Sequence, residues 1–350
     1  MAAERGVRGK RLLVRADANV EIGTGHVMRC LALAQAWQDG GGAVTYAMRT
    51  PEAKVRNRLE SENIATKEIR GAGDAAATVE AARESGANWV VLDGYGFGAE
   101  YQRQMQAAGY PVLFVDDYGH SSEYSAELVL NQNLGADEGW YGKRSPNTRL
   151  LLGTDYSLLR REFRSRGRLR NMFPEVARNV LITIGGADAG NVTALAISAV
   201  AKLGLQEIAV KVAVGPANPH HGELQALVAG LGLPIELVST TTQMPELMEW
   251  ADVAVSATGS TSWELLFMQV PFVGICVADN QRPGTRHLSE KGFAITLDFT
   301  PNLAADDIAD ALKKLVPDQH KRSAMARRGR ELVDGNGVER VIAAMCETRA

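Results

Sequence analysis

Short apolar runs rich in Val, Ile and Leu alternate with stretches of helical apolar spacing along most of the chain. This alternation indicates parallel β-sheets covered by helices, because parallel strands need a crossover connection, usually a helix, between them. In the first half we expect strands at residues 12–16, 43–48, 89–92, 112–115, 128–130 and 150–152. In the second half we expect strands at residues 180–184, 208–214, 235–238, 253–256, 272–276 and 294–297. The predicted fold class is α/β, with two Rossmann-like, doubly wound domains that face each other across a cleft.

Residues 160–179 are charged and poor in apolar side chains, which is typical of a segment between domains. The second series of strands then restarts with a glycine turn of its own, at Gly185 and Gly186. We therefore expect an N-terminal domain over residues 11–165 and a C-terminal domain over residues 176–350. The two halves share no residue-level repeat, so only the architecture is repeated.

The composition argues against several classes of partner. A hydrophobic content of 45% with 23% charged residues is that of a globular chain, and 350 residues are enough for two domains. A net charge of −3 provides no basic field for nucleic acid or an anionic membrane, and no run of about 18 apolar residues is present to span a bilayer. Three scattered cysteines fit a reducing cytoplasm, and their spacing matches no metal site. We expect a cytoplasmic monomer or weak oligomer that uses no metal or other cofactor.

The first expected strand leads into a glycine-rich turn, residues 23–26, that ends at His26. A helical pattern over residues 27–37 follows, and the glycines leave room for a ligand to approach the backbone at its start. At this position the positive end of the helix dipole opposes an imidazolium ion, which favours the neutral histidine that a general base requires. The alternative is a histidine that only caps the helix or lies on the surface.

Polar clusters follow two further strands, at the sheet edge where folds of this class bind ligands. Residues 93–96 form one cluster and residues 116–120 form the other. The phenol of Tyr95 is a candidate hydrogen-bond donor to a ligand, whereas His120 is expected to be an exposed loop residue. Carboxylates beside glycines are also ordinary turn formers, so a purely structural role remains an alternative for both clusters.

The strand expected at residues 253–256 is followed by small hydroxyl residues around a glycine: Gly259, Ser260, Thr261 and Ser262. Hydroxyls and unpaired N–H groups at the start of a helix form a cradle for a diphosphate. Glu264 lies one turn into that helix, within reach of the two hydroxyls of a ribose. The alternative is a Ser or Thr cap with the glutamate completing a capping box. After the next strand, the amides of Asn280 and Gln281 are able to bridge phosphate or sugar oxygens.

Motifs spread over nearly the whole chain carry a resemblance to a known family. They are Arg15-x-Asp17, Ile22-Gly23-x-Gly25-His26-x-x-Arg29, Asp93-x-Tyr95-Gly96, Asp116-Asp117, Leu130-Asn131-x-Asn133, Leu159-Arg160-x-Glu162-Phe163, Gly185-Gly186-x-Asp188, residues 260–264 and Asn280-Gln281. In order and spacing the chain resembles the UDP-sugar hydrolases of pseudaminic acid biosynthesis, the PseG type. This group lies among the two-domain GT-B-like proteins that include the MurG-type glycosyltransferases.

The resemblance implies a role for each motif. His26 would be the catalytic base, Glu264 the ribose contact and residues 259–262 the diphosphate cradle, while Tyr95 and Asn280 would lie near the sugar. Further substrate contacts are implied for Asp17, Gly25, Arg160, Gly185, Gly186 and Gln281. The chain departs from the family pattern at Ala187, where threonine is often found, and in the basic segment 282–286.

The implied substrate partner is a UDP-sugar, UDP-2,4-diacetamido-2,4,6-trideoxy-β-L-altropyranose. Water would attack its anomeric carbon without a metal, releasing UDP and the free sugar with inversion. An inverting glycosyltransferase that uses an acceptor hydroxyl in place of water is an alternative within the same fold. A hydrolysing UDP-sugar 2-epimerase would need a further carboxylate set that is not identified here, and a non-catalytic nucleotide-sugar binding module would bind without releasing UDP.

Overall fold

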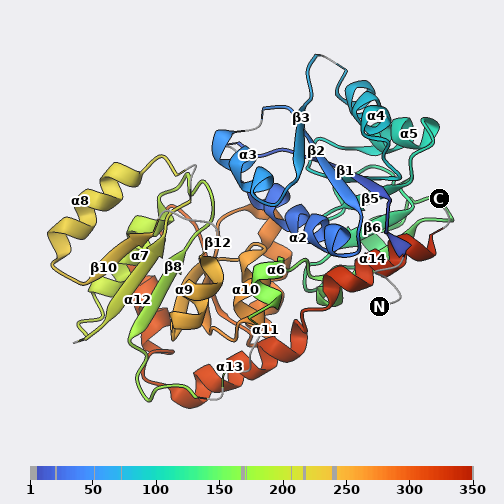
Figure 1. Cartoon of the computed structure of the whole chain (residues 1–350). Helices are drawn as coiled ribbons and strands as arrows, with labels where there is room; N and C mark the ends of the chain where they lie inside the picture. Colours follow the sequence, from blue (N-terminus) through green and yellow to red (C-terminus); the bar gives the residue numbers. More distant parts are fainter. Residues whose placement is uncertain are drawn as a thin grey trace. The chain divides into compact units, whose positions relative to one another are not determined.

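The computed structural model describes residues 6–19, 22–50, 52–71, 73–166, 170, 172–205, 207–215, 218–238 and 243–348. The chain forms two compact units (Figure 1). Unit 1 comprises residues 1–161 and 335–350, and unit 2 comprises residues 162–334. Each unit is built on one parallel sheet, which confirms the doubly wound α/β class.

The sheet of unit 1 has the strand order β3-β2-β1-β4-β5-β6-β7, and every neighbouring pair is parallel. Its strands are β1 (Arg11–Ala16), β2 (Ala43–Met48), β3 (Ala65–Glu68), β4 (Trp89–Asp93), β5 (Val112–Val115), β6 (Leu128–Asn131) and β7 (Arg149–Leu152). The strand order reverses between β1 and β4, so the loops after these two strands diverge to opposite sides. Such a switch point is where sheets of this kind bind ligands.

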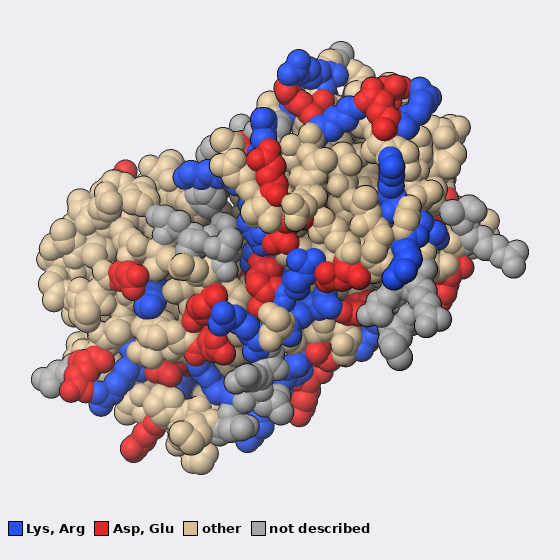
Figure 2. Space-filling model, viewed as in Figure 1, with Lys and Arg blue, Asp and Glu red and all other residues tan. Residues whose placement is uncertain are grey.

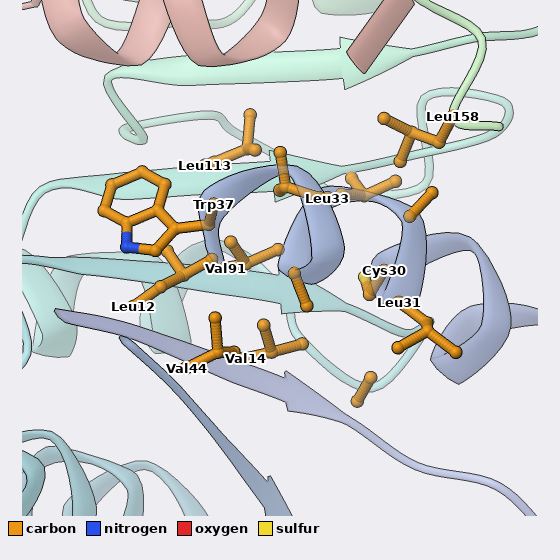
Figure 3. Packing of buried hydrophobic residues seen from close by; sticks show 14 of the residues in the cluster. Leu12, Val14, Cys30, Leu31, Leu33, Trp37, Val44, Val91, Leu113 and Leu158 are labelled. Atoms are coloured by element: carbon orange, nitrogen blue, oxygen red, sulfur yellow. The ribbon is translucent and has the colours of Figure 1, made fainter. Parts of the chain in front are cut away.

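Alternate side chains of these strands enter two cores, because successive residues of a strand point to opposite faces. Leu12 and Val14 pack with helix α2 (Gly25–Asp39), which is buried along nearly its whole length from His26 to Trp37 (Figure 3). The same core takes in residues of α3 (Ala53–Glu60) and of the C-terminal helix α14 (Gly337–Glu347). Leu13 points the other way, to a core shared with α4 (Asp74–Ser85) and α5 (Ala99–Ala107).

Unit 2 repeats this architecture with the strand order β10-β9-β8-β11-β12-β13, again all parallel. Its strands are β8 (Asn179–Thr183), β9 (Ala209–Ala213), β10 (Ile235–Val238), β11 (Val253–Ala257), β12 (Phe272–Cys276) and β13 (Ile295–Asp298). Its helices are α7 (Val192–Ala201), α8 (His221–Leu231), α9 (Met244–Trp250), α10 (Thr261–Phe267), α11 (Arg282–Glu290), α12 (Ala305–Lys313) and α13 (Gln319–Leu332). The order reverses between β8 and β11, so the glycine turn at Gly185 and the hydroxyl run after β11 both lie at the switch point of this sheet.

The strands expected from the sequence are present to within one residue at each end, and β3 is the strand that the apolar pattern misses. A short helix, α6 (Arg161–Arg164), lies in the segment expected between the domains. The C-terminal helix differs from expectation: α14 belongs to unit 1, whereas the sequence places it in a domain over residues 176–350. The reason is its apolar face, on which Val341 and Met345 are buried in the core around α2.

The charged side chains on the face shown in Figure 2 are of both signs and interspersed, which fits the net charge of −3. Among the described residues, no helix combines the length and the apolar character that crossing a bilayer requires.

Candidate active site

The loop after β1 and the end of β4 bring His26 and Asp93 together in unit 1. His26 is the second residue of α2, is 7% exposed, and its Nδ1 lies 2.7 Å from Oδ1 of Asp93. Burial opposes the charge of Asp93, but Arg29 and His26 outweigh it and hold the pKa of this carboxyl far below its usual range. An ionised carboxylate only accepts hydrogen bonds, so Nδ1 carries the hydrogen and donates it. The basic nitrogen of the neutral ring is therefore Nε2.

Arg29 lies one turn after His26 on α2 and joins the carboxylates of two strand ends. Its Nε and Nη2 donate to both oxygens of Asp93 at 2.7 and 2.6 Å, and its Nη1 donates to Oδ1 of Asp117 at 2.6 Å. All these groups are buried, so removing one of them would leave an uncompensated charge inside the protein and destabilise the fold. One guanidinium faces two carboxylates, which leaves one negative charge beside the imidazole.

A second histidine makes the same pairing but is closed to a ligand. Nδ1 of His120 lies 2.8 Å from Oδ1 of Asp116, and its side chain is 8% exposed. The sequence predicts an exposed loop residue here; that prediction is wrong, because the ring packs among Phe114, Tyr95 and Tyr118. The Nε2 atom of His120 is fully buried and has no partner among the described residues.

Nε2 of His26 also has no hydrogen-bond partner among the described residues, but it is not one of the fully buried atoms. Of these two His–Asp pairs, only the one at His26 presents a nitrogen that can take a proton from a ligand or from water.

Tyr95 lies between the two histidines. Its ring meets that of His26 edge to face, with the centroids 4.9 Å apart, and its hydroxyl donates to Oδ2 of Asp117 at 2.7 Å. Burial and the Asp117 carboxylate raise the pKa of Tyr95 far above its ordinary value, so the phenol stays protonated. Its hydrogen is thus directed at Asp117, and the surface that Tyr95 offers to a ligand is mainly its ring.

Three other expected contacts in unit 1 have different surroundings. Oδ1 of Asp17 pairs with Arg15 at 2.7 Å and accepts a hydrogen bond from the Arg49 backbone at 2.8 Å, so this carboxylate braces the loop after β1. Gly25 begins α2, and a Cβ at this position would meet nothing within 4 Å, so the start of the helix is open. Arg160 is buried, at 5% exposure.

In unit 2 the hydroxyl run forms the turn between β11 and α10. Ser260 occupies the N-cap of α10, but its hydroxyl makes no capping hydrogen bond, so the structure does not use the capping box. Thr261 begins α10, and Glu264 lies in the first turn. The hydroxyl of Ser262 is fully buried and has no partner among the described residues.

Gln281 reaches this turn from the short 3₁₀ helix that follows β12. Its Oε1 accepts hydrogen bonds from the hydroxyl of Thr258 at 3.2 Å and from the Val277 backbone at 3.1 Å. A Cβ at Gly259 would lie 3.4 Å from Nε2 of Gln281, so the amide packs directly against the glycine. Gln281 therefore supports the turn. Asn280 is the residue before Gln281 in the 3₁₀ helix over Asp279–Gln281.

The glycine turn after β8 approaches a neighbouring loop closely. Gly185 has a φ of 112°, a conformation that favours glycine, and a Cβ at Gly215 would clash with the backbone of Gly186. Backbone groups therefore form this part of the switch point of unit 2.

The site contains residues to which the sequence assigned no role. Arg29, Asp93 and Asp117 appear in the motifs, but only the structure shows that they form one buried ionic cluster. One signal was available: Asp93 and Asp117 both follow apolar strands, and Arg29 shares a helix face with His26 because residues three apart are neighbours on a helix.

Comparison with known proteins gives matches along the chain. Residues 179–339 match the glycosyltransferase family 28 C-terminal domain. The spore coat polysaccharide biosynthesis protein SpsG of Bacillus subtilis is 24% identical over 94% of this chain and 95% of its own. A UDP-2,4-diacetamido-2,4,6-trideoxy-beta-L-altropyranose hydrolase of Campylobacter jejuni is 24% identical over 81% of this chain and 98% of its own, which confirms the resemblance found in the motifs.

Among solved structures, Anabaena Alr3699/HepE in complex with UDP and glucose superposes with a TM-score of 0.63. It is 15% identical and covers 98% of this chain and 100% of its own, a likeness that shows the fold. The chain therefore has the GT-B fold, and its residues 179–339 match the glycosyltransferase family 28 C-terminal domain.

Proposed function

We propose that the chain hydrolyses a UDP-linked 2,4-diacetamido-2,4,6-trideoxy sugar at its anomeric carbon, as a step of pseudaminic acid biosynthesis. The relative in Campylobacter jejuni bears the name of a hydrolase of such a UDP-sugar and is covered over nearly its whole length. The Anabaena neighbour was solved with UDP and glucose, which supports a nucleotide-sugar as the class of ligand.

The observation that carries this proposal is the state of His26. Its Nδ1 is fixed as a donor to an ionised carboxylate, and its Nε2 is the nitrogen left open. A neutral imidazole held in this tautomer by a carboxylate is the arrangement of a general base.

In the proposed reaction, Nε2 takes a proton from a water molecule as its oxygen bonds to the anomeric carbon. The bond from that carbon to the UDP oxygen breaks, and its electron pair leaves with the diphosphate. Attack opposite the leaving group inverts the anomeric carbon. UDP is stable as an anion, so the enzyme contributes chiefly position and charge stabilisation, and the general base contributes about 10²- to 10⁴-fold.

The nucleotide is assigned to unit 2. Gly259, Ser260, Thr261 and Ser262 would hold the diphosphate, and Glu264 the ribose. The absence of a capping hydrogen bond at Ser260 supports this assignment. In unit 1, Tyr95 would lie beside the sugar because its ring contacts His26.

His26→Asn tests the proposal. Turnover of the UDP-sugar, followed as UDP release and product anomer by NMR, should fall about 10²- to 10⁴-fold. UDP should bind as before in isothermal titration, because the nucleotide is assigned to the other unit. His320→Asn removes an exposed imidazole on α13, away from the residues assigned to the site, and this control should retain its turnover. Near-wild-type turnover in His26→Asn would show that this histidine is not the base.

An inverting glycosyltransferase is the second candidate, favoured by the match to glycosyltransferase family 28. The two functions differ in the nucleophile. A hydrolase releases UDP with water alone, whereas a transferase releases it in quantity only when an acceptor is added. We expect release without an acceptor and in the presence of EDTA; loss of turnover in EDTA that magnesium or manganese restores would contradict the metal-free reaction.

A further inference from the structure

Two tyrosine rings lie exposed beside the candidate base, and only one of them has a role so far. Tyr95 is 38% exposed and Tyr118 is 40% exposed, and their ring centroids are 5.6 Å apart at 47°. They come from the loops after β4 and β5, at the carboxyl edge of the sheet of unit 1. We call these two rings the tyrosine pair.

The tyrosine pair is held from behind by fixed groups. Asp117 accepts the hydrogen bond of the Tyr95 hydroxyl at 2.7 Å. The ring of His120 lies 5.5 Å from that of Tyr95 and 5.7 Å from that of Tyr118, and Asp116 fixes His120 through Nδ1. The ring of Tyr95 is therefore set before any ligand arrives, which lowers the entropy lost on binding, and Tyr118 packs beside this fixed ring.

The carboxylates behind the pair are engaged with neighbouring side chains, whereas the buried Nε2 of His120 has no partner among the described residues. Asp117 is paired with Arg29 as well as with Tyr95, and Asp116 also accepts a hydrogen bond from the Tyr124 hydroxyl at 2.7 Å. The pair offers its ring faces outward, and ring faces favour C–H groups over hydroxyls because a hydroxyl packed there loses its water without gaining a partner. The Tyr118 hydroxyl, which has no hydrogen-bond partner among the described residues, is a separate polar group at the edge of its ring.

The position of the pair identifies its occupant. The Tyr95 ring contacts the ring of His26, so a sugar whose anomeric carbon reacts at Nε2 has to lie next to the pair. We propose that Tyr118 and Tyr95 pack against the apolar side of this sugar, and that Tyr118 makes the site prefer a methyl group at C6 to a hydroxymethyl group. This inference rests on the proposed function and adds the residue that selects the 6-deoxy sugar.

The test compares two nucleotide sugars that differ only in the oxygen at C6: UDP-2,4-diacetamido-2,4,6-trideoxy-β-L-altropyranose and UDP-2,4-diacetamido-2,4-dideoxy-β-L-altropyranose. The full chain carrying His26→Asn is used so that neither probe is consumed. Saturation-transfer NMR reports which ligand protons lie against the protein, and titration gives both affinities. We expect strong saturation of the C6 methyl protons and an affinity about tenfold higher for the 6-deoxy probe, the effect of one small apolar group in an apolar contact.

Adding Tyr118→Ala should remove most of this difference and the methyl saturation, while the uridine protons stay saturated. Tyr118→Phe keeps the ring and should keep the difference in affinity. The control Met172→Ala should keep it too, because it removes an exposed side chain of unit 2, 85% exposed, that has no role in the site.

Equal affinities in the His26→Asn parent, or a difference in affinity that survives Tyr118→Ala, overturn the inference. Unsaturated uridine protons in the parent overturn the proposed function with it. Binding as expected, but no UDP release by the wild-type chain, contradicts hydrolysis alone.

Discussion

At the scale of single residues, the chemistry of the site depends on which nitrogen of a histidine is free. His26 and His120 are each paired through Nδ1 with an aspartate, yet only His26 leaves Nε2 unburied. Asp93 fixes this state, since its carboxylate can only accept a hydrogen bond, and Arg29 keeps that carboxylate ionised. Position along the sequence predicts the candidate base, whereas its tautomer follows from a residue 67 positions away.

Asp93→Asn should therefore lower kcat about 10²- to 10⁴-fold while leaving UDP affinity unchanged. An amide at position 93 can donate to Nδ1, which would move the hydrogen to Nε2 and block proton uptake there. Steady-state kinetics of UDP release gives kcat.

Cys30→Ala is the matched control for this variant. It removes the thiol that also donates to Oδ2 of Asp93, at 3.2 Å, and leaves the bond to His26 in place. Its kcat should stay near that of the wild type. A similar fall in both variants would mean that disturbing the core, rather than the tautomer, causes the loss.

At the scale of elements, the sequence predicts the secondary structure of one segment better than the packing and ion pairs between two segments. Apolar strands such as β5 are recognisable because both of their faces are buried, whereas β3 is missed because its residues are polar and partly exposed at the sheet edge. The amphipathic face of α14 is visible in the sequence, but nothing local says which unit it covers. The ionic cluster is hidden for the same reason: Arg29 and Asp117 are 88 residues apart.

The packing of α14 in unit 1 leads to a prediction about stability, for which a matched substitution in unit 2 is the control. Met345 on α14 is buried in the core around α2, and Met325 on α13 is buried to a similar degree in the core of unit 2. Met345→Ala should destabilise unit 1 by about 2–5 kcal/mol, the usual cost of such a truncation, and Met325→Ala should destabilise unit 2 by a similar amount.

Amide hydrogen exchange with mass spectrometry assigns each loss of protection to its unit. Met345→Ala should raise exchange in α2 and β1, and Met325→Ala in β8 and α7. Increased exchange in unit 2 caused by Met345→Ala would contradict the division of the chain into these units.

At the scale of the whole molecule, unit 1 holds three buried carboxylates with a lowered pKa. The pKa values of Asp93, Asp116 and Asp117 are lowered because their cationic and hydrogen-bonding partners outweigh burial, and all three lie in unit 1. In unit 2 the pKa values of the surface carboxylates Glu290 and Asp310 are lowered by their salt-bridge partners Arg286 and Lys313. The stability of unit 1 should accordingly depend more strongly on acid.

Carboxylates with a depressed folded pKa stabilise the fold above their unfolded pKa of about 4 and lose that contribution as the pH falls below it. On acidification from pH 7 to pH 2, unit 1 should therefore open before unit 2. Brief deuterium labelling at each pH, with exchange rates corrected for pH, gives the unfolding of each unit separately. Simultaneous opening, or earlier opening of unit 2, would contradict this order.

Because α14 comes last in the sequence but packs in unit 1, it also affects the order in which the two units can finish folding during synthesis. A ribosome makes the strands of unit 1 first, then all of residues 162–334, and only afterwards the helix that covers α2. Domains usually fold in the order in which they emerge. Here unit 2 has its whole sequence before unit 1 does, so the segment that carries His26 waits, with part of its core uncovered, until the later unit has been made.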